Sequence, residues 1–199
     1  MSVATVASRA LAGIEAPEVA VEVHLGPGLP AFHIVGLPDT EVREARDRVR
    51  AALNHARFEF PARRITVNLA PAELPKDSSR FDLPIALGIL AASGQLDASA
   101  FGAQEFAGEL SLTGELRSIR GALAMALSAR TAGRAFVLPE GNAPQAALAE
   151  GARILPARTL LQGRRLHRRR VDGKNGARFR RQELVSAERN QRVNNKQND

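Results

Sequence analysis

The sequence contains no cysteine, tryptophan or tyrosine, and only three of its 199 residues are lysine. The lack of cysteine excludes a disulfide framework, an iron–sulfur cluster and a thiolate zinc site. No run of 18 apolar residues occurs, so no transmembrane helix is expected. The first residues lack the basic start and the long apolar core of a signal peptide. Together these absences predict a cytoplasmic protein that makes no contact with a membrane.

Motifs of common enzyme classes are also missing. None of the three lysines stands in a GxxxxGK[ST] phosphate-binding loop, and the four histidines are not spaced as paired metal ligands. No GxSxG nucleophile turn occurs. Gly26 and Gly28 lie between two predicted strands rather than before a helix, so they are no dinucleotide fingerprint. We therefore expect no catalytic, cofactor-binding or metal-ligating residue in this chain.

The net charge of +7 is unevenly distributed. Residues 1–160 carry 16 basic and 17 acidic side chains, a net charge of −1, whereas residues 161–199 carry 12 and 4, a net charge of +8. The basicity is therefore no argument that the globular part binds nucleic acid. The last segment has few apolar residues and no periodicity, which predicts a disordered basic tail over 163–199 after a domain at 1–162.

The hydrophobic pattern of residues 1–162 predicts an α/β (α+β) domain in two layers. Asp39 is a predicted N-cap, and three strands before it are expected to form a meander. Later strands and helices alternate along the chain. The predicted strands are 3–12, 18–25, 31–37, 65–70, 105–112, 114–116, 135–139 and 153–157, and the predicted helices are 40–57, 83–93, 120–131, 142–150 and one that begins near 157.

A loop rich in polar residues separates the strand at 65–70 from the helix at 83–93. Prolines 71 and 75 exclude a continuous helix here. Two interpretations stay open: an internal network of ion pairs and hydrogen bonds, or cations that face DNA phosphate or a neighbouring subunit. The candidate residues of this loop are Lys76, Asp77, Arg80 and Asp82.

Arginines on one side of the 40–57 helix form a second candidate surface, which Arg63 and Arg64 extend. A predicted Glu44–Arg48 pair and neighbouring acids favour a solvated, salt-bridged face, and a strip that contacts phosphate is the alternative. The eight phenylalanines offer no evident stacking platform for bases. The candidate residues on the helix are Arg43, Arg46 and Arg50, with Arg57 near them.

Four segments resemble a known family in the order in which they occur. PKDSSRFDLPIALGILAASG (75–94) and GELSLTGELRSIRG (108–121) follow GIEAPEVAVEVHL (13–25) and GLPAFHIVGLPDTEVREARDRVRAAL (28–53). Together they resemble the N-terminal domain of the ComM family of magnesium-chelatase-like AAA+ ATPases. That domain is similar to the proteolytic domain of Lon and to the C-terminal domain of RadA. The resemblance implies a ribosomal-protein-S5-domain-2-like sandwich with a left-handed βαβ crossover.

The likeness to Lon can be tested at two positions. Lon-type peptidases carry the nucleophilic serine in PKDGPSAG and its lysine base in a GGLKEK-like helix. Here the serine position is Arg80, and the lysine position is Leu123. A serine nucleophile needs such an adjacent base. We therefore expect no peptidase activity, and an active Lon-type serine peptidase is the least favoured hypothesis.

The resemblance implies a non-catalytic accessory or assembly domain of a ComM-like ATPase implicated in DNA branch migration during natural transformation. The family's ATP and Mg²⁺ sites belong to an ATPase module, so the chain is expected to be truncated before that module and to hold no cofactor. Self-association into a ring, hexameric in the full-length family, and backbone contacts to DNA are the expected interactions. The alternative is a stand-alone DNA-binding adaptor that uses the basic tail.

Overall fold

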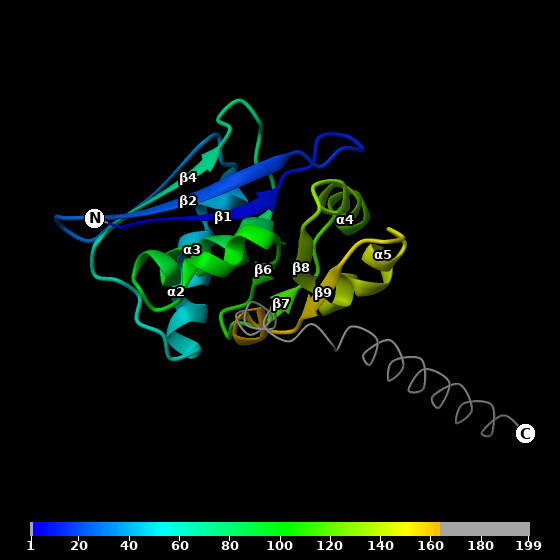
Figure 1. The fold of residues 1–199 in the computed structure, drawn as a ribbon. Helices are drawn as coiled ribbons and strands as arrows, with labels where there is room; N and C mark the ends of the chain where they lie inside the picture. The colour runs from blue at the N-terminus through cyan, green and yellow to red at the C-terminus, as the bar shows by residue number, and fades with distance from the viewer. Residues whose placement is uncertain (1, 164–199) are drawn as a thin grey trace, which may run out of the picture. The chain divides into compact units, whose positions relative to one another are not determined.

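The structure, a computed structural model, describes residues 2–163 (Figure 1). The predicted tail at 163–199 lies outside this range except for its first residue. Within the described range, no helix has the length and apolar character needed to span a bilayer. The mixture of sheets and helices confirms the predicted α+β fold class.

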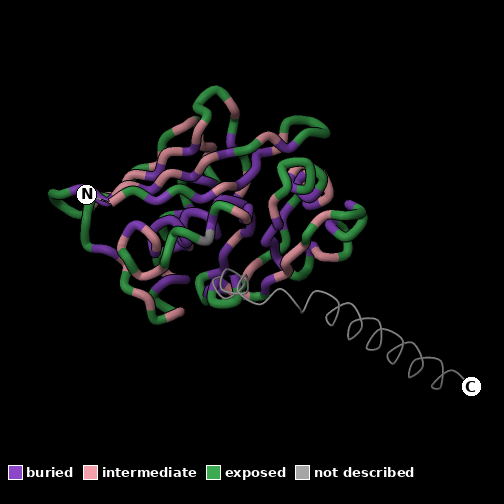
Figure 2. The backbone as a smooth tube through the Cα atoms, in the orientation of Figure 1, coloured by how far each residue is buried: buried purple, intermediate pink, exposed green. Residues whose placement is uncertain are grey.

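The first sheet has the strand order β1-β2-β4-β3. β1 and β2 are antiparallel, β2 and β4 are antiparallel, and β3 runs parallel to β4. Core-facing and outward-facing residues alternate along β2 and β4, so one face of the sheet is buried (Figure 2). The strands are β1 (Ser2–Arg9), β2 (Glu18–Gly26), β3 (Ala31–Val35) and β4 (Arg64–Ala70).

The predicted meander of the first three strands is wrong, because β4 lies between β2 and β3. The inward side chains of β4 are fully buried, which suits an interior strand, whereas β3 leaves His33 and Val35 exposed, as an edge strand can. One consequence concerns the histidines. His24 and His33 both pair with Thr66 from opposite sides, so a whole strand separates them.

The predicted helix at 40–57 is two helices, α1 (Thr40–Arg43) and α2 (Ala45–His55). Asp39 caps α1 as predicted, since its Oδ1 accepts from the N–H of Val42 at 2.8 Å. At the break between the two helices, the Glu41 carbonyl accepts from Arg48 Nη2 at 2.7 Å. Both helices lie on the connection from β3 to its parallel neighbour β4. The left-handed sense of this crossover stays a prediction.

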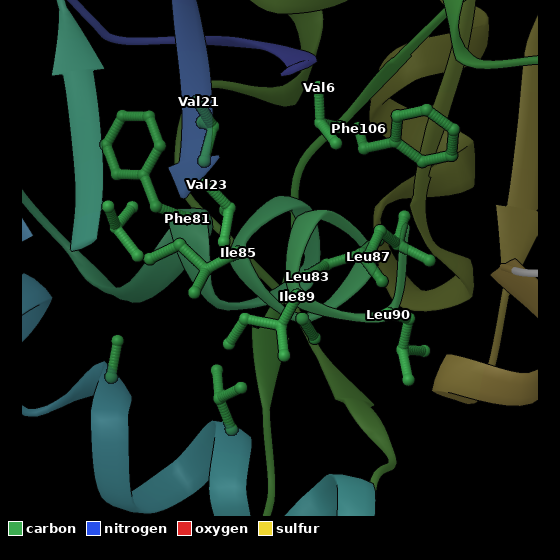
Figure 3. Close-up of a cluster of buried hydrophobic side chains, with 14 of the residues drawn as sticks. Val6, Val21, Val23, Phe81, Leu83, Ile85, Leu87, Ile89, Leu90 and Phe106 are labelled. Atoms are coloured by element: carbon green, nitrogen blue, oxygen red, sulfur yellow. The ribbon is translucent and has the colours of Figure 1, made fainter. Parts of the chain in front are cut away.

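Helix α3 (Asp82–Ala92) forms the centre of the core, and a single 3₁₀ turn at Ser79–Phe81 leads into it. It is apolar on all sides, as a helix enclosed by other elements must be. Figure 3 shows its side chains beside Val6 of β1 and beside Val21 and Val23 of β2. At Gly88 the helix approaches β2 so closely that an added Cβ would lie 2.5 Å from Val23 Cγ2. Its labelled core residues are Leu83, Ile85, Leu87, Ile89 and Leu90.

A second, parallel sheet of order β5-β8-β9 follows. The predicted strand at 105–112 is divided between this sheet and a hairpin around Gly114, because the chain leaves the sheet after three residues. The remaining elements are 3₁₀ turns at Ala98–Ala103 and Glu140–Asn142, β5 (Gln104–Phe106), β6 (Glu109–Leu110), β7 (Leu116–Arg117), α4 (Ala122–Thr131), β8 (Ala135–Pro139), α5 (Ala143–Ala147) and β9 (Ile154–Ala157).

A buried ion pair joins the two sheets. Arg9 of β1 donates from Nε and Nη2 to the two carboxylate oxygens of Glu105 on β5, each at 2.6 Å. Arg134 lies 3.4 Å from the same carboxylate and 2.9 Å from Glu18. Because such bidentate pairs fix geometry as well as charge, this cluster sets how β1 and β5 sit against each other. Sequence analysis did not identify it.

Candidate functional site

Lys76 lies in the loop that leads from β4 to α3. Its backbone is held on both sides, since its N–H donates to the Leu37 carbonyl at 3.3 Å and its carbonyl accepts from Asp39 N–H at 3.0 Å. Its side chain is only 1% exposed, and Nζ donates to the Pro71 carbonyl. Burial lowers the pKa of Lys76, although the carboxylate of Glu73 acts in the opposite direction. The ammonium group therefore holds the loop together.

Asp82, the first residue of α3, is fully buried. Arg48 of α2 donates to its carboxylate from Nε at 2.7 Å and from Nη2 at 3.1 Å, and the N–H of Leu110 on β6 donates at 3.1 Å. Burial raises the pKa of Asp82 to about 6, because the loss of solvation outweighs these hydrogen bonds, which favour the ionised form. One carboxylate thus connects α2, α3 and β6.

Arg48 is the partner of Asp82, and the sequence did not identify this pair. Its predicted pair with Glu44 exists at 3.6 Å, but the shorter bond goes to Asp82. The sequence held a sign that Arg48 lies partly inward. Arg48 is three residues after Ala45 and four before Ala52, which places it at the border of the buried face of the helix. A long cation at that border can reach an acid beneath the helix. The acid 34 residues away could not be identified from helix spacing alone.

The Arg80 side chain of the loop is enclosed by its surroundings, with 1% of the residue exposed. Its Nε donates to Ser78 Oγ at 2.8 Å, and its Nη2 lies 3.4 Å from Asp77 Oδ1. Nη1 is buried without a hydrogen-bond partner among residues 2–163. Burial lowers the pKa of Arg80, and the carboxylates of Asp77 and Asp39 partly offset that effect. Asp77 itself is 61% exposed.

The two serines of the loop are also engaged. Ser78 has a φ of +64° and a ψ of 160°, a conformation that costs a non-glycine residue about 1–3 kcal/mol. Its N–H donates to Asp39 Oδ2 at 3.2 Å, so the cap of α1 also fixes this strained residue. Ser79 Oγ donates to Glu109. Leu123, at the position of the peptidase lysine, is half-buried against the apolar cluster around α4.

The loop is therefore arranged as an internal network. Lys76, Arg80 and Asp82 point inward, and only Asp77 is open to solvent. This burial argues against the expectation that the three inward side chains contact DNA or a neighbouring subunit, because such contacts need exposed groups. The arrangement holds both serines in place, because Ser78 Oγ accepts from Arg80 and Ser79 Oγ donates to the Glu109 carboxylate.

The second candidate surface is exposed throughout, at Arg43, Arg46, Arg50, Arg63 and Arg64. Arg46 lies 3.6 Å from Asp47, but both side chains are largely in water, where such a pair contributes little. For the other four arginines, no carboxylate oxygen of the described chain lies within 4.0 Å. The salt-bridged interpretation thus accounts for Arg46 alone.

No group of three or more histidine, aspartate or glutamate side chains in residues 2–163 is placed to hold a metal ion. A surface hollow of about 600 Å³ lies near Arg63 rather than beside the loop at 71–82.

Comparison with known proteins identifies relatives for most of this domain. The chain is 53% identical over 161 residues to "Competence protein ComM" of Haemophilus influenzae, which covers 81% of this chain and 32% of that protein. It is 52% identical over 148 residues to the uncharacterized protein YifB of Salmonella typhimurium, covering 74% and 29% of the two chains. For YifB of Escherichia coli the identity is 48% over 157 residues, covering 79% and 31%.

The chain thus spans about a third of the length of the curated relatives that it matches. A sequence model of one family, described as "Subunit ChlI of Mg-chelatase", matches residues 21–142. That range includes the buried loop network, the arginine-bearing helix α2 and the hairpin β6–β7. Because the match covers more than half of the sequence, this chain belongs to the family of subunit ChlI of Mg-chelatase.

Proposed function

We propose that this domain is a non-catalytic accessory or assembly part of a ComM-like AAA+ ATPase that acts in DNA branch migration during natural transformation. The observation that carries the proposal is the 53% identity to Competence protein ComM over 161 residues. The ATPase module, with its ATP and Mg²⁺ sites, would lie in the part of such a protein that this chain does not span.

The absence of chemistry in this domain is supported by the loop itself. Arg80 occupies the position of a peptidase nucleophile, and its hydrogen bonds hold the loop closed. Leu123 at the position of the base has no proton to exchange. A scaffold whose polar loop is used for internal bonding can still serve as a rigid body that positions a motor or its substrate.

A chimera tests this function directly. Residues 1–162 would replace the matching region of Haemophilus influenzae ComM, and natural transformation frequency would be measured in a strain that lacks its own ComM. We expect the chimera to restore transformation, whereas ComM without this region should not. A chimera that accumulates to the normal level but leaves transformation at the level of the deletion strain would overturn the proposal.

The peptidase hypothesis needs its own control. The purified chain should not cleave casein, and Ser79→Ala should leave this result unchanged. Reproducible cleavage that is lost in Ser79→Ala would contradict the non-catalytic assignment.

The stand-alone DNA adaptor remains a second candidate because residues 161–199 carry a net charge of +8. It predicts that DNA affinity depends mainly on this segment. Replacing Arg168, Arg169 and Arg170 with glutamine should then remove most of the binding. If the affinity instead changes by less than two-fold, the adaptor hypothesis fails in this form.

A further inference from the structure

Four exposed arginines lie on the segment from α2 to the first residue of β4, and we call them the arginine surface: Arg50, Arg57, Arg63 and Arg64. All four are exposed, and none has a carboxylate of residues 2–163 within 4.0 Å. They come from α2, from the connection between α2 and β4, and from the first residue of β4 (Figure 1). Cations that do not stabilise the fold through ion pairs are available to an anionic partner.

The backbone holds these arginines in fixed places. Arg57 ends α2 in the left-handed conformation, with φ of +61°, and its N–H donates to the Asn54 carbonyl at 3.0 Å. The Arg63 carbonyl accepts from the N–H of Ala31 at 3.4 Å. Arg64 pairs with Gly26 on one side and with Ala31 on the other. Sheet register therefore determines where Arg63 and Arg64 emerge.

Arg50 is held by a different interaction. Its guanidinium carbon lies 5.1 Å from the centre of the Phe60 ring, and Phe60 in turn stacks on Phe32 with ring centres 6.3 Å apart and planes at 25°. A cation over an aromatic face is favourable even at an exposed site. Guanidinium planes are surfaces on which unpaired bases stack. The arrangement supplies the stacking platform that the composition did not reveal.

Two hollows adjoin Arg63. One, of about 600 Å³, is lined by residues that include Pro61, Ser93 and Gln95, and the other, of about 390 Å³, is lined by the turn at 26–28. Arg63 lines both hollows, and among the described residues Glu59 is the only carboxylate that lines either of them. Space of this size beside a fixed cation suits a sugar or a base whose phosphate meets the guanidinium.

We propose that the arginine surface binds the phosphodiester backbone of single-stranded DNA, with a base stacked on Arg50. A single strand fits better than a duplex, because the surface offers hollows and a stacking plane and no helix or strand that projects into a groove. The choice of DNA as the polynucleotide rests on the proposed function, whereas the surface does not.

A pair of double variants of the full chain tests the location. The probe is a fluorescent oligothymidylate of 20 nucleotides, and its affinity is measured at several salt concentrations. Arg63→Gln/Arg64→Gln should weaken binding about ten-fold. It should also reduce the slope of the logarithm of the binding constant against the logarithm of the salt concentration by about 1.4, because each lost phosphate contact on a single strand lowers that slope by roughly 0.7. The matched control is Arg120→Gln/Arg153→Gln, which removes the same charge from two other exposed positions.

The control should change the affinity less than two-fold. Residues 164–199 are identical in both variants, so their contribution cancels in the comparison. Equal losses in the two variants, or no loss in either, would overturn the proposed surface. Tighter binding of a 20-base-pair duplex that Arg63→Gln/Arg64→Gln weakens equally would overturn the single-strand assignment.

Arg50→Lys tests the stacking platform, because it keeps the charge and removes the planar group. We expect a three- to five-fold loss of affinity with an unchanged salt dependence. An unchanged affinity would remove the base-stacking part of the proposal.

None of these assays needs an ATPase. If the ComM chimera fails but oligothymidylate binding depends on the arginine surface as expected, only the proposed function is rejected. If the chimera restores transformation but the arginine variants bind oligothymidylate normally, only the DNA surface is rejected.

Discussion

The network of hydrogen bonds and ion pairs around the loop at 71–82 and the arginine surface use arginine in opposite ways. Arg48 and Arg80 each have a carboxylate partner and contribute to packing, whereas Arg50, Arg57, Arg63 and Arg64 are exposed without one among residues 2–163. Both sets lie in the sequence that matches the ChlI family. The comparison shows that the role of an arginine in this domain depends on burial and partner rather than on local charge density.

Among the variants that test this contrast, Arg48→Ala should have the largest effect on stability. It leaves the carboxylate of Asp82 buried without its partner, and breaking such a pair costs about 3–5 kcal/mol. We expect a loss of that size in the free energy of unfolding at pH 7.5, measured with urea. The loss should be smaller at pH 5, where protonation neutralises Asp82. Arg50→Ala is the matched control, and a similar loss in it would refute the contrast.

Arg80→Ala separates an internal from an external role. Removing an enclosed side chain should destabilise the domain by roughly 2–3 kcal/mol, which corresponds to a fall in melting temperature of about 4–12 °C. Oligothymidylate affinity should stay within two-fold of the wild-type value. If the affinity falls while the melting temperature does not change, Arg80 reaches the partner and the internal assignment is wrong.

Stability should depend on pH through Asp82. Its pKa of about 6 in the folded state exceeds the ordinary value, so the native state binds more protons than the unfolded state between about pH 4 and 6. This group therefore adds stability as the pH falls through 6, on the order of 2 kcal/mol by pH 4. The difference between the wild type and Asp82→Asn should show this dependence. A flat difference over that range would contradict it.

Arg63→Gln/Arg64→Gln should have the smallest effect on stability. Exposed side chains without ion pairs usually change the free energy of unfolding by less than about 0.5 kcal/mol. Thermal unfolding of this variant should match the wild type even where its DNA affinity is lower. A clear destabilisation would mean that these arginines are structural, which would remove the distinction between the two regions.

The sequence predicted local structure better than it predicted partners in space. The cap at Asp39, the strand at 65–70 and the helix at 83–93 follow from short-range patterns and are confirmed. The meander failed because β4 separates β2 and β3, although consecutive strands are usually neighbours. The prediction of one unbroken helix at 40–57 is wrong, because α1 and α2 are separated at Glu44, where the Glu41 carbonyl accepts from the Arg48 side chain.

The candidate loop was found from its composition and position, but its orientation was not. Alternating charges are compatible with an inward network and with an outward face, and no spacing rule separates the two. The bond from Arg48 to Asp82 joins two elements 34 residues apart, and the pair of Arg9 with Glu105 spans 96 residues. Pairs between residues so far apart in the sequence cannot be identified from local patterns and require the folded structure.

What the sequence determined by itself was the family resemblance and the α+β class. These follow from residue identity and local periodicity, which need no third dimension. Tertiary structure alone decided which arginines are buried and which are open. Burial depends on how distant segments pack, and it is the energy of desolvation, offset or not by a partner from another element, that separates a structural cation from a binding one.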